Sequence, residues 1–168
     1  MKLDTIITNR LILRPFSPDD LEAYLPIMTN PQVTRFLGSG KDKTPEDVRQ
    51  VMELFMQYPQ EHGFGVWAVL LRESEKLIGH CGFLALEDGS GVELLYAFDP
   101  TVWGKGIASE AAQICLDYAR QHGLWEHLYA LAYPENAASI RVLEKLGFYP
   151  DGDTFCFGQM LKRFLYKL

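Results

Sequence analysis

The sequence predicts an α/β protein in which helices pack on a mixed sheet. Residues 64–98 hold three apolar runs joined by short polar turns, a pattern typical of an antiparallel meander. In the C-terminal half, two segments with helical spacing of apolar residues are each flanked by strand-like runs. Strands on both sides of these helices make one mixed sheet the simplest architecture.

One strand and two helices are expected in the N-terminal part of the chain. The apolar run Arg10–Arg14, which Pro15 ends, predicts the first strand. Ser17–Asp20 combines a capping serine, a proline at the first helical position and two aspartates, and so predicts a helix start. Thr44–Asp47 repeats this arrangement and predicts a second helix, which is expected to end just before Pro59.

Residues 64–98 are predicted to form three consecutive strands. These are Phe64–Leu71, Leu77–Leu86 and Val92–Phe98. The joining segments, 72–76 and 87–91, are short and polar, as hairpin turns require. Because turns this short join antiparallel neighbours, the middle of the sheet is expected to be antiparallel.

Two further helices and three strands are expected in the C-terminal part. Each helix ends at a glycine, Gly123 or Gly147, a residue that favours the left-handed conformation found at helix C-termini. The predicted elements are a helix from about Gly106 to His122, a strand Leu128–Tyr133, a helix that follows Asn136, and strands Asp153–Phe157 and Leu161–Leu168.

The composition excludes several classes of protein. With 168 residues, of which 48% are hydrophobic, the chain is expected to fold as a single domain, residues 1–168. No apolar run is long enough to cross a membrane, and Met1–Asp4 shows no signal-peptide pattern, so a cytoplasmic location is expected. The net charge of −6, without a basic stripe, argues against a nucleic-acid partner.

The cysteines and histidines give no support for a metal site. Cys81, Cys115 and Cys156 are far apart in the sequence and odd in number, and they are expected to be reduced thiols in apolar segments. The four histidines lack the H-E-x-x-H spacing of zinc enzymes. The sequence therefore predicts a protein without a metal.

The segment Trp103–Ala108 carries the strongest functional signal in the sequence. Gly104 and Gly106 flank one residue between a predicted strand and a predicted helix, so the backbone can turn tightly and expose several N–H groups. The helix that follows adds the positive end of its dipole, which favours a phosphate or pyrophosphate. Ser109 and Glu110 stand where the third glycine of a dinucleotide-binding G-x-G-x-x-G would come.

A second segment, Asn136–Phe148, reads N-x-x-S followed by K-L-G-F. Together, the two segments resemble the GCN5-related N-acetyltransferase (GNAT) superfamily, whose acyl-CoA pyrophosphate loop reads Q/R-x-x-G-x-G/A. Thr8–Pro15 and Trp103–Ala111 are similar to motifs of its RimJ/RimL-type branch. The resemblance covers essentially the whole chain. It implies a GNAT-like acyl-CoA N-acyltransferase fold, a mostly antiparallel sheet with helices on both faces.

The resemblance also implies acetyl-CoA as the acyl donor and assigns residues to it. Backbone amides of the glycine loop would bind the pyrophosphate, and the strand before the loop would line the pantetheine arm beside the thioester. Asn136 would contact the pantetheine or hold the start of its helix. The implied cofactor-binding residues are Tyr96, Ala97, Phe98, Trp103, Gly104, Lys105, Gly106, Ile107, Ala108, Ser109, Asn136 and Ser139.

Two residues are predicted to be catalytic. Many family members protonate the leaving thiolate with a tyrosine, but Leu143 occupies the corresponding position. Ser139, one turn earlier, is the implied donor; a capping or solvent-facing hydroxyl is the alternative. Glu93 is the predicted base that takes a proton from the amine, and an exposed strand glutamate is the alternative.

The acceptor is less well defined by the sequence. The resemblance implies that the first two helices and residues 36–43 form the wall of its site, with Tyr24, Phe36, Trp67 and Tyr133 as possible lining residues. The predicted activity is acetyl transfer to a primary amine of a small molecule or a protein N-terminus, by a monomer or homodimer without a membrane partner. Two other readings stay open: a CoA-binding module without turnover and a nucleotide-dependent oxidoreductase.

Overall fold

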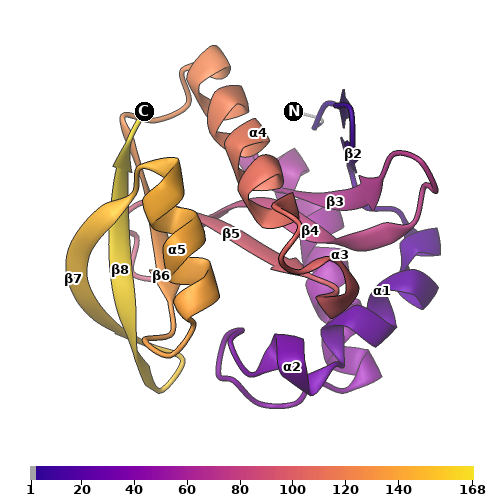
Figure 1. Ribbon diagram of the computed structural model, residues 1–168, viewed down its shortest axis with the longest axis horizontal. Coiled ribbons are helices and arrows are strands. Elements are labelled where there is room, and N and C mark those ends of the chain that lie inside the picture. Colours follow the sequence, from indigo (N-terminus) through magenta and orange to yellow (C-terminus); the bar gives the residue numbers. More distant parts are fainter. Residues whose placement is uncertain (1–2) are drawn as a thin grey trace.

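The computed structural model describes residues 3–168 (Figure 1). The start of the chain, where no signal peptide is expected, thus lies partly outside the described residues. Eight strands form one sheet in the order β1-β2-β3-β4-β5-β6-β8-β7. The strands are β1 (Ile6–Ile7), β2 (Leu11–Arg14), β3 (Val66–Leu71), β4 (Leu77–Ala85), β5 (Val92–Phe98), β6 (His127–Ala132), β7 (Tyr149–Cys156) and β8 (Gln159–Lys167).

The predicted fold class is confirmed: the sheet is mostly antiparallel and helices cover both of its faces. Among the described strands, only β5 and β6 run parallel to each other. The α-helices are α1 (Leu21–Met28), α2 (Pro31–Thr34), α3 (Pro45–His62), α4 (Ile107–His122) and α5 (Ala137–Leu146), and the short 3-10 helices are η1 (Pro18–Asp20) and η2 (Pro100–Val102). No described helix has both the length and the apolar character needed to cross a bilayer.

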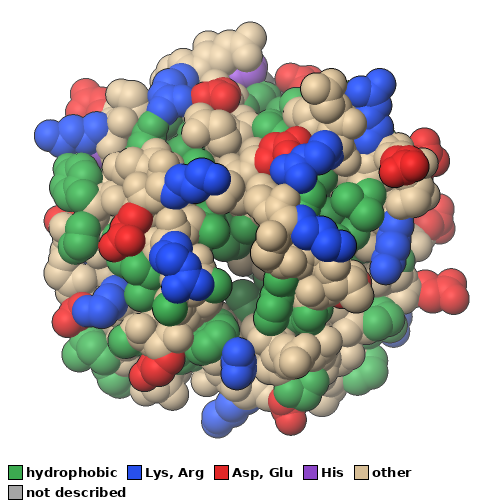
Figure 2. All heavy atoms as spheres, in the orientation of Figure 1, with side chains coloured by type: hydrophobic (Ala, Val, Ile, Leu, Met, Phe, Trp, Pro, Cys, Tyr) green, Lys and Arg blue, Asp and Glu red, His purple; other side chains and the backbone are tan. Residues whose placement is uncertain are grey.

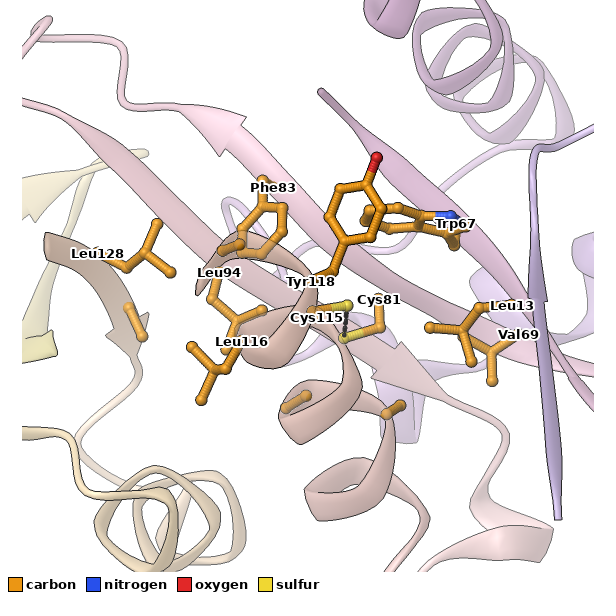
Figure 3. Packing of buried hydrophobic residues seen from close by; sticks show 14 of the residues in the cluster. Leu13, Trp67, Val69, Cys81, Phe83, Leu94, Cys115, Leu116, Tyr118 and Leu128 are labelled. Carbon is orange, nitrogen blue, oxygen red and sulfur yellow. Dashed lines mark hydrogen bonds between the residues drawn. The ribbon is translucent and has the colours of Figure 1, made fainter. Parts of the chain in front are cut away.

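A separate hydrophobic core lies on each face of the sheet. One core packs α4 against β3, β4 and β5; Figure 3 shows Leu94 beside Leu116 and Trp67 beside Tyr118 in this core. The other core joins α1 and α3 to the opposite face, where Ala97 is buried. Alternate residues of β5 therefore belong to different cores, as the two-residue repeat of a strand requires.

The end of α3 differs from the prediction. Pro59 lies inside the helix, which continues to His62. Gly63, with φ of +78°, ends the helix in the left-handed conformation and its N–H donates to the carbonyl of Pro59. The Pro59 ring also packs closely against the position of Gly65. Tertiary packing and the glycine therefore determine the helix end, and the proline is accommodated before it.

Two short elements and one strand boundary also differ from the prediction. β1 and α2 have only two and four residues, too few for a periodic pattern in the sequence. β7 begins at Tyr149, four residues before the predicted start at Asp153. Its pairing with β8 shifts register between Pro150 and Asp153. Because β7 is an edge strand, it can hold a proline and an irregular pairing.

Candidate functional site

The parallel strands β5 and β6 separate near the centre of the sheet. They pair in register at one position, Glu93 opposite Tyr129. Beyond this pair, the edge of β5 that carries Tyr96, Ala97 and Phe98 has no paired strand among the described residues. Figure 2 shows a hollow in this face, between α5 and α2, with Lys and Arg side chains around it. The gap can admit an extended ligand, and its surroundings favour a negatively charged one.

The loop before α4 presents a series of unused backbone donors. Gly104 and Gly106 have φ of +73° and +75°, so the chain turns through two left-handed positions. The first helical bond is from the N–H of Glu110 to the carbonyl of Gly106. Within residues 3–168, no hydrogen bond is made by the backbone N–H groups from Gly104 to Ser109. With the positive end of α4, these amides form a site suited to a pyrophosphate.

Residues far away in the sequence brace this loop. Arg10 donates through Nη1 to the Lys105 carbonyl at 2.9 Å and through Nε to Glu110 Oε2 at 2.6 Å. Trp103, predicted to bind the cofactor, donates its indole N–H to the Phe98 carbonyl at 2.8 Å. This bond ties the loop to the end of β5. The sequence prediction missed the bracing roles of Arg10 and Glu110, although both residues lie in the motifs that carry the family resemblance.

The start of α5 is joined to β5 by two hydroxyl groups. Asn136 is the N-cap of the helix, and its Oδ1 accepts a hydrogen bond from the Ser139 N–H at 3.2 Å. The hydroxyl oxygens of Tyr96 and Ser139 are 2.9 Å apart. Burial raises the pKa of Tyr96 above its ordinary value, so the phenol stays protonated. Leu143 is buried in the core and has no proton to donate.

Glu93 lies on the opposite face of β5 from Tyr96. Its partner on the neighbouring strand β4 is Leu84, which packs in the core of α1 and α3. Burial, and to a smaller extent the charge of Glu87, raises the pKa of Glu93 to about 7. No side chain or backbone group in the described residues donates a hydrogen bond to its carboxylate. A carboxyl with this pKa can accept a proton at neutral pH.

The two predicted catalytic residues therefore approach the strand gap from opposite sides. Ser139 is held by Tyr96 on the face of α4 and α5, whereas Glu93 is on the face of α1 and α3. A thioester that entered beside Ser139 could meet an amine that entered beside Glu93. This arrangement would let the two substrates approach the reacting carbon from opposite faces of the sheet.

Two of the four residues predicted to line the acceptor site do not do so. Tyr24 and Trp67 are fully buried in the two cores, and the Tyr24 hydroxyl makes a 2.7 Å hydrogen bond with His80 Nδ1. In contrast, Phe36 and Tyr133 lie together with ring centroids 5.9 Å apart. The Tyr133 hydroxyl donates to the Gly38 carbonyl at 2.6 Å, which joins the end of β6 to the loop between α2 and α3.

The described residues contain no group of three or more His, Cys, Asp or Glu side chains placed to hold a metal ion. Cys81 and Cys115 are buried with their sulfurs 3.5 Å apart, and Figure 3 shows them facing each other between β4 and α4. Cys156 is unlike them, because it is only partly buried and lies at the end of β7. All three are free thiols, and only the first two are fully buried.

Comparisons with known proteins agree with this geometry. Residues 10–149 match a family described as the Acetyltransferase (GNAT) domain. The uncharacterized N-acetyltransferase YoaA of Bacillus subtilis is 30% identical over 161 residues, covering 95% of this chain and 87% of that protein. An acetyltransferase structure from Agrobacterium tumefaciens has a TM-score of 0.86 at 25% identity, covering 100% of this chain and 96% of the other.

The fold is also that of RimL, a ribosomal L7/L12 α-N-protein acetyltransferase solved with coenzyme A. That structure has a TM-score of 0.82 at 17% identity and covers 98% of both chains. The chain belongs to the GNAT family of N-acetyltransferases. It is therefore an acyltransferase that uses acetyl-CoA and an amine acceptor. This assignment favours an enzyme over a binding module and over a nucleotide-dependent oxidoreductase.

Proposed function

We propose that residues 1–168 form a single catalytic domain that acetylates a primary amine by direct attack on the thioester of acetyl-CoA. The placement of Glu93 and the Tyr96–Ser139 pair on opposite faces of the sheet, at the gap between β5 and β6, supports this proposal. Acetyl-CoA supplies an acetyl group activated as a thioester. The acceptor is either a small-molecule amine or, as the name of RimL states for that protein, a protein α-amine.

The N–H groups of Gly104–Ser109 hold the pyrophosphate, and the free edge of Tyr96–Phe98 lies beside the pantetheine arm. Glu93 accepts the proton that the attacking nitrogen loses as its bond to the acetyl carbon forms. A backbone N–H of the free β5 edge donates to the carbonyl oxygen.

As the carbon–sulfur bond breaks, the Ser139 hydroxyl gives a proton to the sulfur and takes one back from solvent. The Tyr96 phenol remains protonated and keeps Ser139 oriented. Trp103 and Asn136 act indirectly, because one braces the glycine loop and the other caps α5.

Thermal shift measurements with acetyl-CoA, CoA and NAD in separate samples test the cofactor site. A ligand at one hundred times its Kd adds about 2.7 kcal/mol of stability. We expect both CoA species to raise Tm and NAD to leave it unchanged. An equal rise with NAD, or no rise with either CoA species, would contradict the proposed pyrophosphate site.

A thiol-release assay with a panel of primary amines then tests turnover. We expect acetylation of at least one amine, confirmed by the mass of the product. Binding of acetyl-CoA without acetylation of any amine, including basic and acidic N-terminal peptides, would favour the non-catalytic module instead. The missing tyrosine at Leu143 is the observation that keeps this second function in view.

A further inference from the structure

The face of the sheet that carries Glu93 also holds a cavity of about 200 Å³. The turn between β4 and β5 (residues 86–90) forms one wall, and the hairpin between β7 and β8 (residues 154–158) forms another. Leu131 of β6 and Arg163 of β8 complete the lining. None of the residues assigned above to acetyl-CoA lines this cavity.

The cavity lies beside the proposed base. Glu93 pairs with Tyr129 across the two parallel strands, and Leu131, two residues further along β6, shares the face of Tyr129. The turn between β4 and β5 rests on the same ring, because a Cβ at Gly91 would lie only 2.7 Å from Tyr129 Cε2. Burial raises the pKa of the cavity residue Cys156, and the charges of Glu87 and Glu93 raise it further.

Negative charge exceeds positive charge around the cavity. Glu87 and Asp88 line it and are exposed to solvent, and Glu93 lies beside them. The positive charge in the lining is that of Arg163, whose Nη2 is 2.8 Å from Asp151 Oδ2 and which also interacts with Asp88, so Glu87 is the exposed carboxylate of the lining without a positive partner among the described residues. Because Glu93 accepts no hydrogen bond from the described residues, its charge is also uncompensated. A ligand with positive charge would balance these carboxylates.

Exposed aromatic side chains stand in the other wall. Phe155 is 72% exposed and Phe157 is 45% exposed, both in the hairpin that lines the cavity. Aromatic faces next to carboxylates can contact methylene groups and also attract an ammonium through cation–π interactions. The volume is below the range of about 300–1,000 Å³ typical of drug-sized ligands, so it fits one small molecule.

We propose that this cavity binds the acceptor, and that the acceptor is a small aliphatic amine with a second positive charge, such as an alkyl diamine. This inference rests on the proposed function, because the reacting nitrogen must reach Glu93. That nitrogen, which enters as a neutral amine, loses a proton to Glu93 and bonds to the acetyl carbon, while the thiol leaves with a proton from Ser139, which regains one from solvent. The second ammonium stays charged and is bound by Glu87 and Asp88.

Steady-state kinetics with matched amines test the proposal. We expect kcat/KM for 1,4-diaminobutane to exceed that for butylamine by about three- to fivefold, the size of the effect that an ion pair with solvent-exposed carboxylates has on affinity. In the double variant Glu87→Gln/Asp88→Asn this ratio is expected to fall to near one. The control is Glu73→Gln, an exposed glutamate in the turn between β3 and β4, which is expected to keep the wild-type ratio.

The outcomes separate this inference from the proposed function. Equal use of butylamine and 1,4-diaminobutane, or a preference that survives the double variant, would overturn the inference and leave acetyl transfer intact. Faster acetylation of a lysine-containing N-terminal peptide than of the diamine would overturn it in favour of a protein acceptor. Acetyl-CoA binding without acetylation of any amine would contradict the proposed function itself.

Discussion

The hydroxyl oxygens of Tyr96 on β5 and Ser139 on α5 lie 2.9 Å apart, across the face where the strands of the sheet separate. Tyr96 Oη also lies 3.4 Å from the Ser139 carbonyl oxygen. Both acceptors available to the phenol hydrogen therefore belong to Ser139. When the phenol donates, the Ser139 hydrogen is free to point toward a leaving sulfur.

We therefore expect Tyr96→Phe to lower kcat by about tenfold with little change in KM for acetyl-CoA, and Ser139→Ala to lower it by about 10²-fold, the lower end of the range for acid–base groups. The double variant should be no slower than Ser139→Ala, because the phenol acts through the serine. Tyr149→Phe, which removes the hydroxyl of an exposed tyrosine at the start of β7, is the control. Additive losses in the double variant would mean that the two hydroxyls act separately.

The pH dependence of the rate should report on Glu93. Its pKa is about 7, so the carboxyl is protonated below that pH and cannot accept a proton from the amine. We expect kcat of the wild type to fall as pH decreases through about 7. Glu93→Gln should lower the rate most above pH 7 and lose this acidic limb. An unchanged pH profile in the variant would remove Glu93 from the mechanism.

Glu93 should also make the stability of the protein depend on pH: the rate rises as pH increases, whereas the stability falls. The Glu93 pKa rises from 4.5 to about 7 on folding, so the folded state favours the protonated carboxyl. The stability present below pH 4.5 is lost as pH rises through about 7. We expect Glu93→Gln to raise Tm at pH 8 and to leave it unchanged at pH 4. Equal Tm values at pH 8 would show that the buried carboxylate costs no stability.

The glycine loop can be tested by its backbone alone. Gly106 has φ of +75°, and a Cβ there would meet Arg10 Nη2 at 3.7 Å. Gly106→Val should weaken acetyl-CoA binding by at least about tenfold, because the strained turn would redirect the free amides. The control is Gly123→Ala at the other end of α4, where φ is +57° and a Cβ meets nothing within 4 Å. Calorimetric titration with acetyl-CoA measures both; undiminished affinity in Gly106→Val would contradict the assignment.

His80 should make the protein less stable in mild acid. Its burial lowers the pKa from 6.5 to about 3, so the folded state keeps the ring neutral. As pH falls below 6.5, the unfolded chain gains a proton at His80 that the folded chain does not. Because Glu93 acts in the opposite direction between pH 4.5 and pH 7, the measurement is made in the Glu93→Gln background, where we expect the free energy of unfolding to decrease between pH 6.5 and pH 4 and His80→Gln to reduce this slope. Urea titrations at several pH values measure it, and a slope that is the same in both proteins would refute this cause.

The sequence predicted those features that depend on local pattern. The capping signals at Thr44 and Asn136 act as caps, and Gly123 and Gly147 end their helices in the left-handed conformation. The glycine loop was found by its spacing, because two left-handed positions before a helix require glycine. These signals involve neighbours in the chain, so they can be read without the fold.

Features that depend on distant contacts were not predicted. The sequence shows neither that Tyr96 meets Ser139 nor that Arg10 braces Lys105, because each contact joins elements far apart in the chain. Burial also decided the wrong assignments: the ring of Tyr24 has a polar tip suited to a site, but the fold places it inside the core with His80. Side-chain chemistry alone does not distinguish a core tyrosine from a lining one.

Because β5 and β6 pair at a single register position, the sheet is weakly connected between these two strands. The five strands on one side of this boundary, and the three on the other, are joined within each group by antiparallel pairing. Between the two groups, there is one register position. On one face, the Tyr96–Ser139 contact and the packing of α4 against both β5 and α5 connect the two parts of the sheet. A molecule bound along this boundary would contact both groups of strands at the positions where the strands do not pair. Acetyl-CoA bound along this gap, as we propose, would therefore hold the two parts of the sheet together as well as donate the acetyl group.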